Sequence, residues 1–138
     1  KWIYHCGWYP DRKLRLFDSR AGKWGGSNPH DKYEMNEGDE ATGFLKGDIL
    51  HYSYTTLKDH YRQVEYFTKI SSEGLFQSGK TTNSITIYFS PVIKFIRDYI
   101  VKLGFLDGAS GFTISKISAY ATYLKYKKLQ TLWEANRG

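Results

Sequence analysis

The stretch TTLKDHYRQVEYFTKISSEGLF, residues 55–76, decides the fold prediction, because its apolar positions recur every three or four residues. That spacing is the period of an amphipathic helix and predicts one of about 20 residues from Thr56 onward. Thr55 or Thr56 suits the N-cap, Asp59 is placed for a capping box, and Gly79 lies just beyond the expected end. The recurring positions are Leu57, Tyr61, Val64, Phe67 or Thr68, Ser71 and Leu75.

A second helix is predicted over residues 90–103. Ser90 can cap it, Pro91 suits the first helical position, and Gly104 is a natural terminator. Residues 82–89 are ambiguous, since their β-branched side chains suit a strand as well as a helical lead-in. The residues expected to share one face of this helix are Val92, Ile96, Tyr99 and Leu103.

A third helix is predicted over residues 109–134, with Asp107 as its cap. Its inward residues are expected to be Ile117, Tyr120, Ala121 and Leu124. Upstream of all three helices, strand-forming residues at 2–4, 14–17 and 44–52 alternate with turn signals. The sequence therefore predicts an α+β chain, with a β-rich segment over residues 1–55 and a helical region over 56–138.

Composition sets the outer limits of this prediction. The 138 residues are 41% hydrophobic and 25% charged, which argues against a disordered chain. One cysteine excludes a disulfide-rich or Cys-rich zinc scaffold. The sequence contains no run of about 18 apolar residues, so it predicts no simple membrane-spanning helix. The chain begins with Lys1 and shows no signal-peptide pattern, so we expect it to start inside a longer protein.

The positive charge is unevenly distributed. Residues 1–83 hold 12 Lys and Arg against 11 Asp and Glu, whereas residues 84–138 hold 8 against 3. Together with 17% aromatic residues, this favours a polyanionic partner, either nucleic acid or an anionic membrane surface. Nucleic acid is disfavoured, because no recognised binding motif is present and the first half is nearly neutral.

The usual catalytic and metal-binding motifs are absent. The chain has no Walker loop, GxGxxG, HExxH, CxxC pair or GxSxG elbow. The four histidines do not pair with one another or with Cys6 at a metal-ligand spacing, so each one alone suits a structural or surface role.

Four segments carry a resemblance when taken in order along the chain. They are Gly7-Trp8-Tyr9-Pro10-Asp11 with Leu14-Arg15-Leu16-Phe17, then Trp24-Gly25-Gly26 with His30-Asp31, then residues 47–54, and then residues 104–112. Together they resemble the C-terminal half of bacterial family 2 glycosyltransferases that build lipopolysaccharide core or related surface glycans. Each motif is weak alone, but the ordered set extends over nearly the whole chain.

The resemblance implies an inverting transferase of the GT-A type. In such enzymes the N-terminal half supplies the nucleotide-binding units and an Asp-rich metal motif, and no Asp-x-Asp occurs here. It therefore implies an inactive fragment of an enzyme whose complete form uses a divalent metal, Mg or Mn. The implied partners are a nucleotide-sugar donor and a lipid-linked saccharide acceptor, at the cytoplasmic face of the membrane.

The resemblance also suggests which residues do the chemistry. A His followed by an acidic residue stands at His30-Asp31, which makes Asp31 the candidate base and His30 a metal or phosphate neighbour. The alternative for Asp31 is a capping role after Pro29. His51 is either a cleft-lining residue or a buried, hydrogen-bonded histidine.

Four other residues are candidate substrate contacts. Arg15 would lie opposite Leu14 and Leu16 on a strand and could hold a diphosphate, or be an ordinary solvent-facing Arg. Trp8 and Trp24 could stack on a sugar ring or pack in the core. Asp11 could orient an acceptor hydroxyl or belong to a Pro-Asp turn.

Two surface properties complete the sequence-based expectations. Helices carrying basic and aromatic side chains are suited to lie on an anionic membrane, unless their charged faces are simply solvated. Strands cut from a larger sheet leave open edges, which predicts a homodimer or a swapped arrangement.

Overall fold

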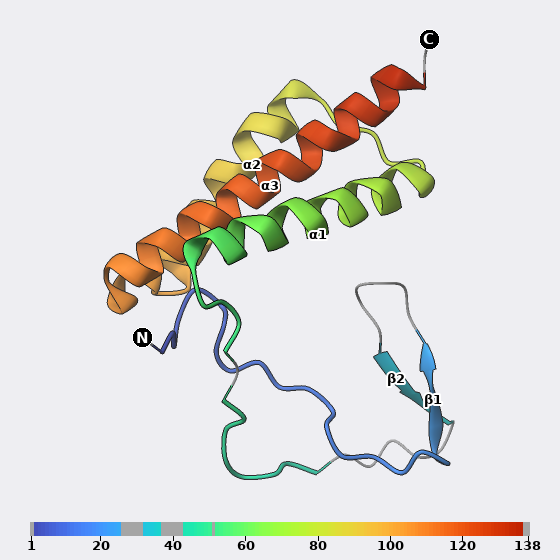
Figure 1. Ribbon diagram of the computed structural model, residues 1–138, viewed down its shortest axis with the longest axis vertical. Coiled ribbons are helices and arrows are strands. Elements are labelled where there is room, and N and C mark those ends of the chain that lie inside the picture. The colour runs from blue at the N-terminus through green and yellow to red at the C-terminus, as the bar shows by residue number, and fades with distance from the viewer. Residues whose placement is uncertain (1, 26–31, 37–42, 51, 137–138) are drawn as a thin grey trace. The chain divides into compact units, whose positions relative to one another are not determined.

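The computed structural model describes residues 2–25, 32–36, 43–50 and 52–136. The chain divides into two compact units. The first unit joins Lys1–Asp11 to Thr56–Gly138 and contains the helices of the described residues, and the second is Arg12–Thr55 and contains a two-stranded sheet (Figure 1). The predicted α+β class, with short strands ahead of three helices, is confirmed. In this division the first eleven residues group with the helices, and the predicted domain boundary at residues 55–56 stays a prediction.

Helix α1 (Leu57–Gln77) forms where local signals place it. The Thr56 hydroxyl accepts a hydrogen bond from Asp59 N at 3.1 Å, and the Asp59 carboxylate accepts one from Thr56 N at 3.2 Å. This reciprocal capping box satisfies two amide donors that the first helical turn cannot use. Gly79, with φ of +71°, follows the C-cap Ser78. The predicted start, cap and terminator are confirmed.

Helix α2 (Ser84–Ile96) begins six residues earlier than predicted. Its N-cap is Asn83, whose side-chain oxygen accepts a hydrogen bond from Thr86 N at 2.8 Å. The predicted start at Ser90 was wrong, and Pro91 lies inside the helix. The Asn83 cap supplies the start, and packing against α3 outweighs the weak helix propensity of the β-branched residues that follow. A π-helical turn, η1 (Arg97–Val101), continues the chain.

The inward face of α2 also differs from the prediction. Val92, Ile96 and Leu103 are exposed by 54%, 45% and 45% of their surface, whereas Ile87 is buried. Asp98, within η1, is buried as well and pairs with Lys94 on the preceding turn at 2.7 Å. The expectation failed because periodicity finds an apolar face but not the direction in which tertiary packing turns it.

Helix α3 (Ala109–Ala135) follows the short 3-10 turn η2 (Gly104–Asp107). Its N-cap residue is Gly108, which makes no side-chain cap, so the predicted capping role of Asp107 was wrong. The Asp107 carboxylate instead accepts hydrogen bonds from the N-terminal segment. Ile117 is buried as predicted, but Tyr120 is 40% exposed and does not belong to the core.

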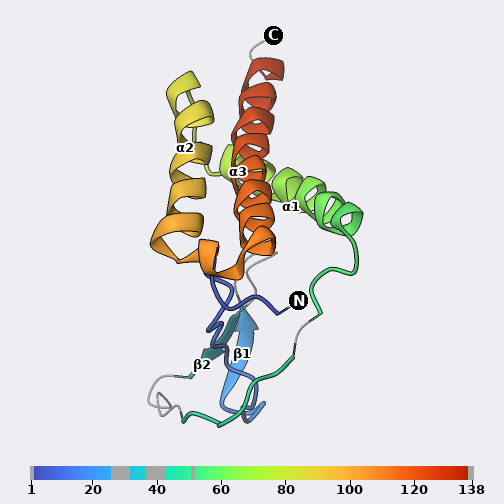
Figure 2. The same cartoon turned by 90° about the vertical axis from the view of Figure 1, so that its left-hand side faces the viewer.

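Helix α3 lies between α1 and α2 and packs against both (Figures 1 and 2). Its buried apolar side chains are Ile114 and Ile117 near its start and Leu129 near its end. The buried apolar residues of α1 and α2 are Val64 and Ile87. This apolar core is small for so many aromatic and aliphatic residues, so a large apolar surface stays outside it.

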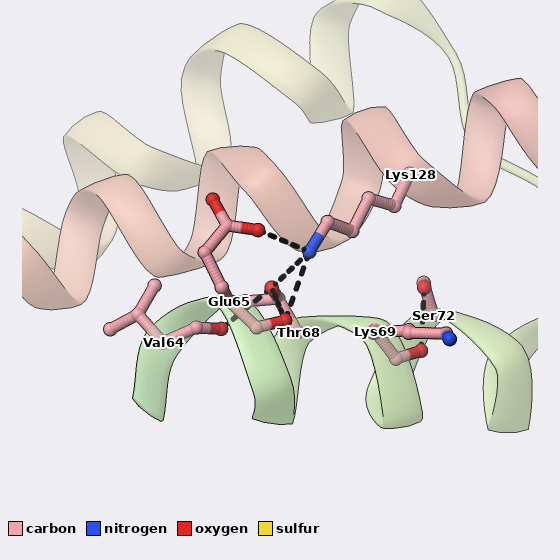
Figure 3. Close-up of polar contacts among 6 residues, drawn as sticks. All are labelled: Val64, Glu65, Thr68, Lys69, Ser72 and Lys128. Carbon is pink, nitrogen blue, oxygen red and sulfur yellow. Dashed lines mark hydrogen bonds and ion pairs between the residues drawn. The ribbon is translucent and has the colours of Figure 1, made fainter. Parts of the chain in front are cut away.

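A polar seam completes the contact between α1 and α3 (Figure 3). Lys128 Nζ lies 2.8 Å from the Glu65 carboxylate and 3.0 Å from the Glu65 carbonyl and the Thr68 hydroxyl. Thr68 donates its own hydroxyl proton to Val64 O at 2.7 Å. The Thr68 hydroxyl and the Lys128 ammonium are therefore both hydrogen-bonded, within one helix or between α1 and α3.

The second unit contains strands β1 (Gly22–Gly25) and β2 (Lys32–Met35), which pair antiparallel with Trp24 opposite Tyr33. The segments predicted as strands, residues 2–4, 14–17 and 44–52, contain no strand where the structure describes them. Those predictions were wrong, because β-propensity needs a hydrogen-bonded neighbour to become a strand.

Candidate functional site

Three aromatic rings gather on the hairpin of the second unit. Phe17 and Tyr33 stack with ring centroids 3.9 Å apart, and Trp24 lies edge-on to them at 5.6 and 5.8 Å. Cross-strand pairing places Trp24 and Tyr33 side by side, and Tyr33 donates its hydroxyl proton to Asp18 O at 2.7 Å. We call Phe17, Trp24 and Tyr33 the aromatic cluster.

The aromatic cluster is not a core. Trp24 is 66% exposed, although its ring is held by the other two. An ordered and exposed indole is suited to the flat C–H face of a sugar ring, because both surfaces are apolar and planar while the indole N–H stays available for a hydroxyl. Its exposure shows that Trp24 is not a core residue, and its sugar-stacking role stays a prediction.

Arg15 lies in the same unit, but not on a strand. The predicted strand that would have set Arg15 opposite Leu14 and Leu16 is absent from the described residues 14–17, and these leucines are exposed by 41% and 77%. Arg20 is held in an ion pair at 2.7 Å from Asp18, and hydrogen bonds from its side chain and its backbone N–H lower the pKa of Asp18. Arg15 is an exposed guanidinium that stays a candidate anion contact.

Three predicted site residues, His30, Asp31 and His51, lie outside the described residues. In the sequence, His30 and Asp31 stand between β1 and β2, and Asp31 directly precedes the first residue of β2. Their catalytic and binding roles stay predictions.

Trp8 and Asp11 belong to the first unit, whereas Arg15 and Trp24 belong to the second. The Trp8 ring is half-buried and lies edge-on to His60, with centroids 6.2 Å apart. Burial lowers the pKa of His60, which keeps the imidazole neutral at lower pH than usual. Trp8 is thus partly a packing residue, and Asp11 is exposed at the end of the N-terminal segment.

A histidine–carboxylate pair, which the sequence analysis missed, joins the N-terminal segment to η2. Asp107 accepts hydrogen bonds from His5 N at 2.8 Å and Tyr4 N at 3.4 Å, and its carboxylate lies 3.2 Å from His5 Nδ1. Desolvation raises the pKa of Asp107, but the hydrogen bonds from His5 and Tyr4 outweigh it and leave that pKa below its ordinary value. No local pattern could reveal this pair, because 102 residues separate its members.

Cys6, next to this pair in the sequence, is also held against the helices. Cys6, at φ of +59°, donates its backbone N–H to Lys102 O at 3.2 Å, and its sulfur lies 3.5 Å from Gly111 O and Ser115 Oγ. Burial raises the pKa of the Cys6 thiol, which makes it a poor nucleophile. The His5–Asp107 pair therefore fastens residues 4–6 to the helices.

The described part of the chain supplies no obvious metal site, since no three of its His, Cys, Asp or Glu residues are grouped to hold an ion. Within the same residues, no helix combines the length and the apolar content needed to cross a membrane.

The relatives that comparison with known proteins finds include three from the genus Rickettsia. The chain is 26% identical over 109 residues to the uncharacterized glycosyltransferase RP128 of Rickettsia prowazekii (strain Madrid E), which covers 77% of this chain and 37% of the relative. It is 23% identical over 125 residues to the uncharacterized glycosyltransferase RT0209 of Rickettsia typhi (strain ATCC VR-144 / Wilmington), covering 86% and 43%. A third, an uncharacterized glycosyltransferase of Rickettsia bellii (strain RML369-C), is 27% identical over 88 residues, covering 64% and 30%.

The matched region spans less than half the length of these curated relatives. No family model matches the chain. No solved structure matches it either.

Proposed function

We propose that the chain is part of a glycosyltransferase and that the second unit contributes a surface that holds a sugar. The observation that carries the proposal is the agreement between two independent features. The relatives bear the name glycosyltransferase over matches that cover 64% to 86% of this chain. The aromatic cluster, within this chain, exposes the tryptophan that a sugar ring would contact.

The finer assignment rests on the ordered motifs. They favour a family 2, GT-A enzyme that transfers a sugar with inversion to a lipopolysaccharide-type or other lipid-linked acceptor. In this reaction the acceptor hydroxyl loses its proton to a base and its oxygen bonds to the anomeric carbon. The bond from that carbon to the nucleoside diphosphate breaks, and the diphosphate leaves with the electron pair.

Two residues of this chain are assigned roles in that step. Asp31 is proposed as the base that takes the hydroxyl proton, and Arg15 as a cation that neutralises charge on the departing diphosphate. Trp24 is proposed to orient the sugar. The substrate contacts that the resemblance suggests for Trp8, Asp11 and His51 stay separate expectations.

The proposal gives this chain no metal-dependent step. The described residues do not group as a ligand set, and the sequence has no Asp-x-Asp. The divalent ion of the complete enzyme, with His30 as its nearest candidate neighbour in this chain, stays an expectation from the resemblance.

A transfer assay tests the proposal on the complete gene product, with a panel of nucleoside diphosphate sugars and extracted glycolipid as acceptor. Asp31→Asn should lower kcat by roughly 100-fold or more, because the base is lost while the shape is kept. Trp24→Ala should mainly raise KM, by about tenfold, since a stacked ring contributes to binding. Tyr66→Ala, which removes an aromatic side chain 60% exposed on α1, is the matched control.

Two results would overturn the proposal. One is a complete protein that turns over no nucleotide-sugar while Asp31 is intact. The other is a Trp24→Ala variant whose kinetic constants equal those of Tyr66→Ala.

A further inference from the structure

Helix α2 presents its most apolar side to solvent. Five residues, Ile85, Phe89, Val92, Ile93 and Ile96, are exposed by 45% to 69% of their surface. At about 100° per residue they fall within an arc of about 100°, so they form one continuous strip along the helix. We call these five residues the outer face of α2.

The outer face is larger than the scattered apolar residues of an ordinary surface. A soluble helix normally turns such a strip toward its core, but the inward side of α2 carries Ile87 and the residues around the Lys94–Asp98 ion pair. The apolar strip continues into η1, where Ile100 is 55% exposed. A contiguous patch of this kind marks a surface that binds another apolar phase or partner.

The charges around the outer face indicate the sign of that partner. Residues 74–136 hold eight Lys and Arg against three Asp and Glu. Two of these three, Asp98 and Asp107, are only 1% and 4% exposed, which leaves Glu134 as the one exposed carboxylate in residues 74–136. Exposed Lys80 and Lys102 stand just before α2 and just after η1, so lysines bracket the strip along the sequence, with the Lys102 side chain lying against Gly7.

We propose that the outer face of α2 docks on an anionic lipid bilayer, with the helix lying in the plane of the interface. An apolar strip bracketed by lysines matches acyl chains beneath negatively charged headgroups. A helix of 13 residues is about 20 Å long, shorter than the hydrocarbon core of about 30 Å, so it fits the surface rather than the span.

The charges also favour a bilayer over a second copy of this chain as the partner of the outer face. Two outer faces brought together would place the bracketing lysines near one another, with Glu134 as the one exposed acidic residue of residues 74–136 to offset them. The basic residues of α3 add little to the docking surface where they are already engaged. Lys128, for example, is bound to Glu65 in the seam between α1 and α3.

Vesicle co-sedimentation of the 138-residue chain tests the proposal. The vesicles are phosphatidylcholine alone, or equal parts of phosphatidylcholine and phosphatidylglycerol. We expect binding to the anionic vesicles and loss of binding as salt is raised. The double variant Phe89→Gln/Ile93→Gln removes two side chains that are both 63% exposed, and each change should weaken partitioning by roughly tenfold. Lys80→Gln/Lys102→Gln should weaken it by about fivefold for each charge removed.

The matched control is Leu45→Gln/Ile49→Gln, which removes side chains exposed by 77% and 73% in the second unit. Circular dichroism should show unchanged helix content in all variants, because every altered side chain is exposed. Binding that survives Phe89→Gln/Ile93→Gln, or falls equally in the control, overturns the proposal. So does a dimer in analytical ultracentrifugation that this variant dissociates, since the outer face would then bind a second copy.

The inference goes beyond the proposed sugar transfer and does not depend on it. The vesicle assay contains no donor or acceptor, so failed binding leaves the transferase proposal standing. Failed transfer in the complete protein leaves the docking result standing in the same way.

Discussion

Replacing Asp107 by alanine should release the N-terminal segment from the helices. The carboxylate accepts hydrogen bonds from the backbone N–H groups of His5 and Tyr4 and faces His5 Nδ1 at 3.2 Å. Hydrogen bonds to a charged acceptor contribute about 1.5–3 kcal/mol each. The Tyr4 bond is long, at 3.4 Å, and Tyr4 is 53% exposed, so water can replace that partner. The loss therefore comes mostly from His5, and we expect about 2–4 kcal/mol of unfolding free energy.

The isosteric variant Asp107→Asn separates the loss of the charge from the loss of the hydrogen-bond acceptor. Its amide keeps one acceptor oxygen for His5 N but loses the charge, so the expected cost is about 1–2 kcal/mol. Urea unfolding followed by far-ultraviolet circular dichroism measures both variants, since the helices and residues 2–11 form one unit. Limited proteolysis adds a local readout, because residues 2–11 should become cleavable before the helices do. Glu134→Ala, at an exposed carboxylate on α3, should change stability by less than about 0.5 kcal/mol.

The pH dependence of this stabilisation has a definite sign. The pKa of Asp107 in the folded chain lies below the ordinary value of 3.8, so the unfolded chain binds the proton first as pH falls. The difference between wild type and Asp107→Ala should be complete above the ordinary value and close as pH falls below 3.8. The stabilising role of Asp107 would be refuted if the two unfolding free energies differed by less than about 0.5 kcal/mol at neutral pH. A difference that does not change with pH through that window would refute it too.

Three further predictions concern the helical unit. Gly111→Ala should destabilise it by about 1–3 kcal/mol in thermal unfolding, because the added Cβ would overlap the Gly104 carbonyl oxygen, and an unchanged midpoint would contradict this. The lowered pKa of His60 predicts stability that is complete above pH 6.5 and declines as pH falls further, and His60→Gln should flatten that dependence in urea titrations. Lys128→Met should cost about 1–2 kcal/mol by leaving the polar seam without its donor, whereas Lys127→Met at an exposed position should be nearly neutral; equal effects would count against the seam.

The candidate site could be predicted only in part. Trp24 is 66% exposed, and the sugar-contact role suggested by its residue type and motif stays a prediction. The supposed strand around Arg15 failed, because a short apolar run does not show whether a partner strand is present. The His5–Asp107 pair was missed because neither residue stands in a recognisable motif with the other.

The sequence by itself determined α1, because its capping box, its spacing of apolar positions and its terminating glycine act between residues a few positions apart. It also determined the excess of positive charge on which the proposed docking to an anionic surface rests. Only the tertiary structure decided that α2 begins at Ser84 and turns Phe89 and Ile93 to solvent. The same holds for Asp107, which holds the N-terminal segment rather than capping α3. The physical reason is that periodicity and caps act locally, whereas the direction of a face and the partner of a buried charge depend on residues distant in the chain.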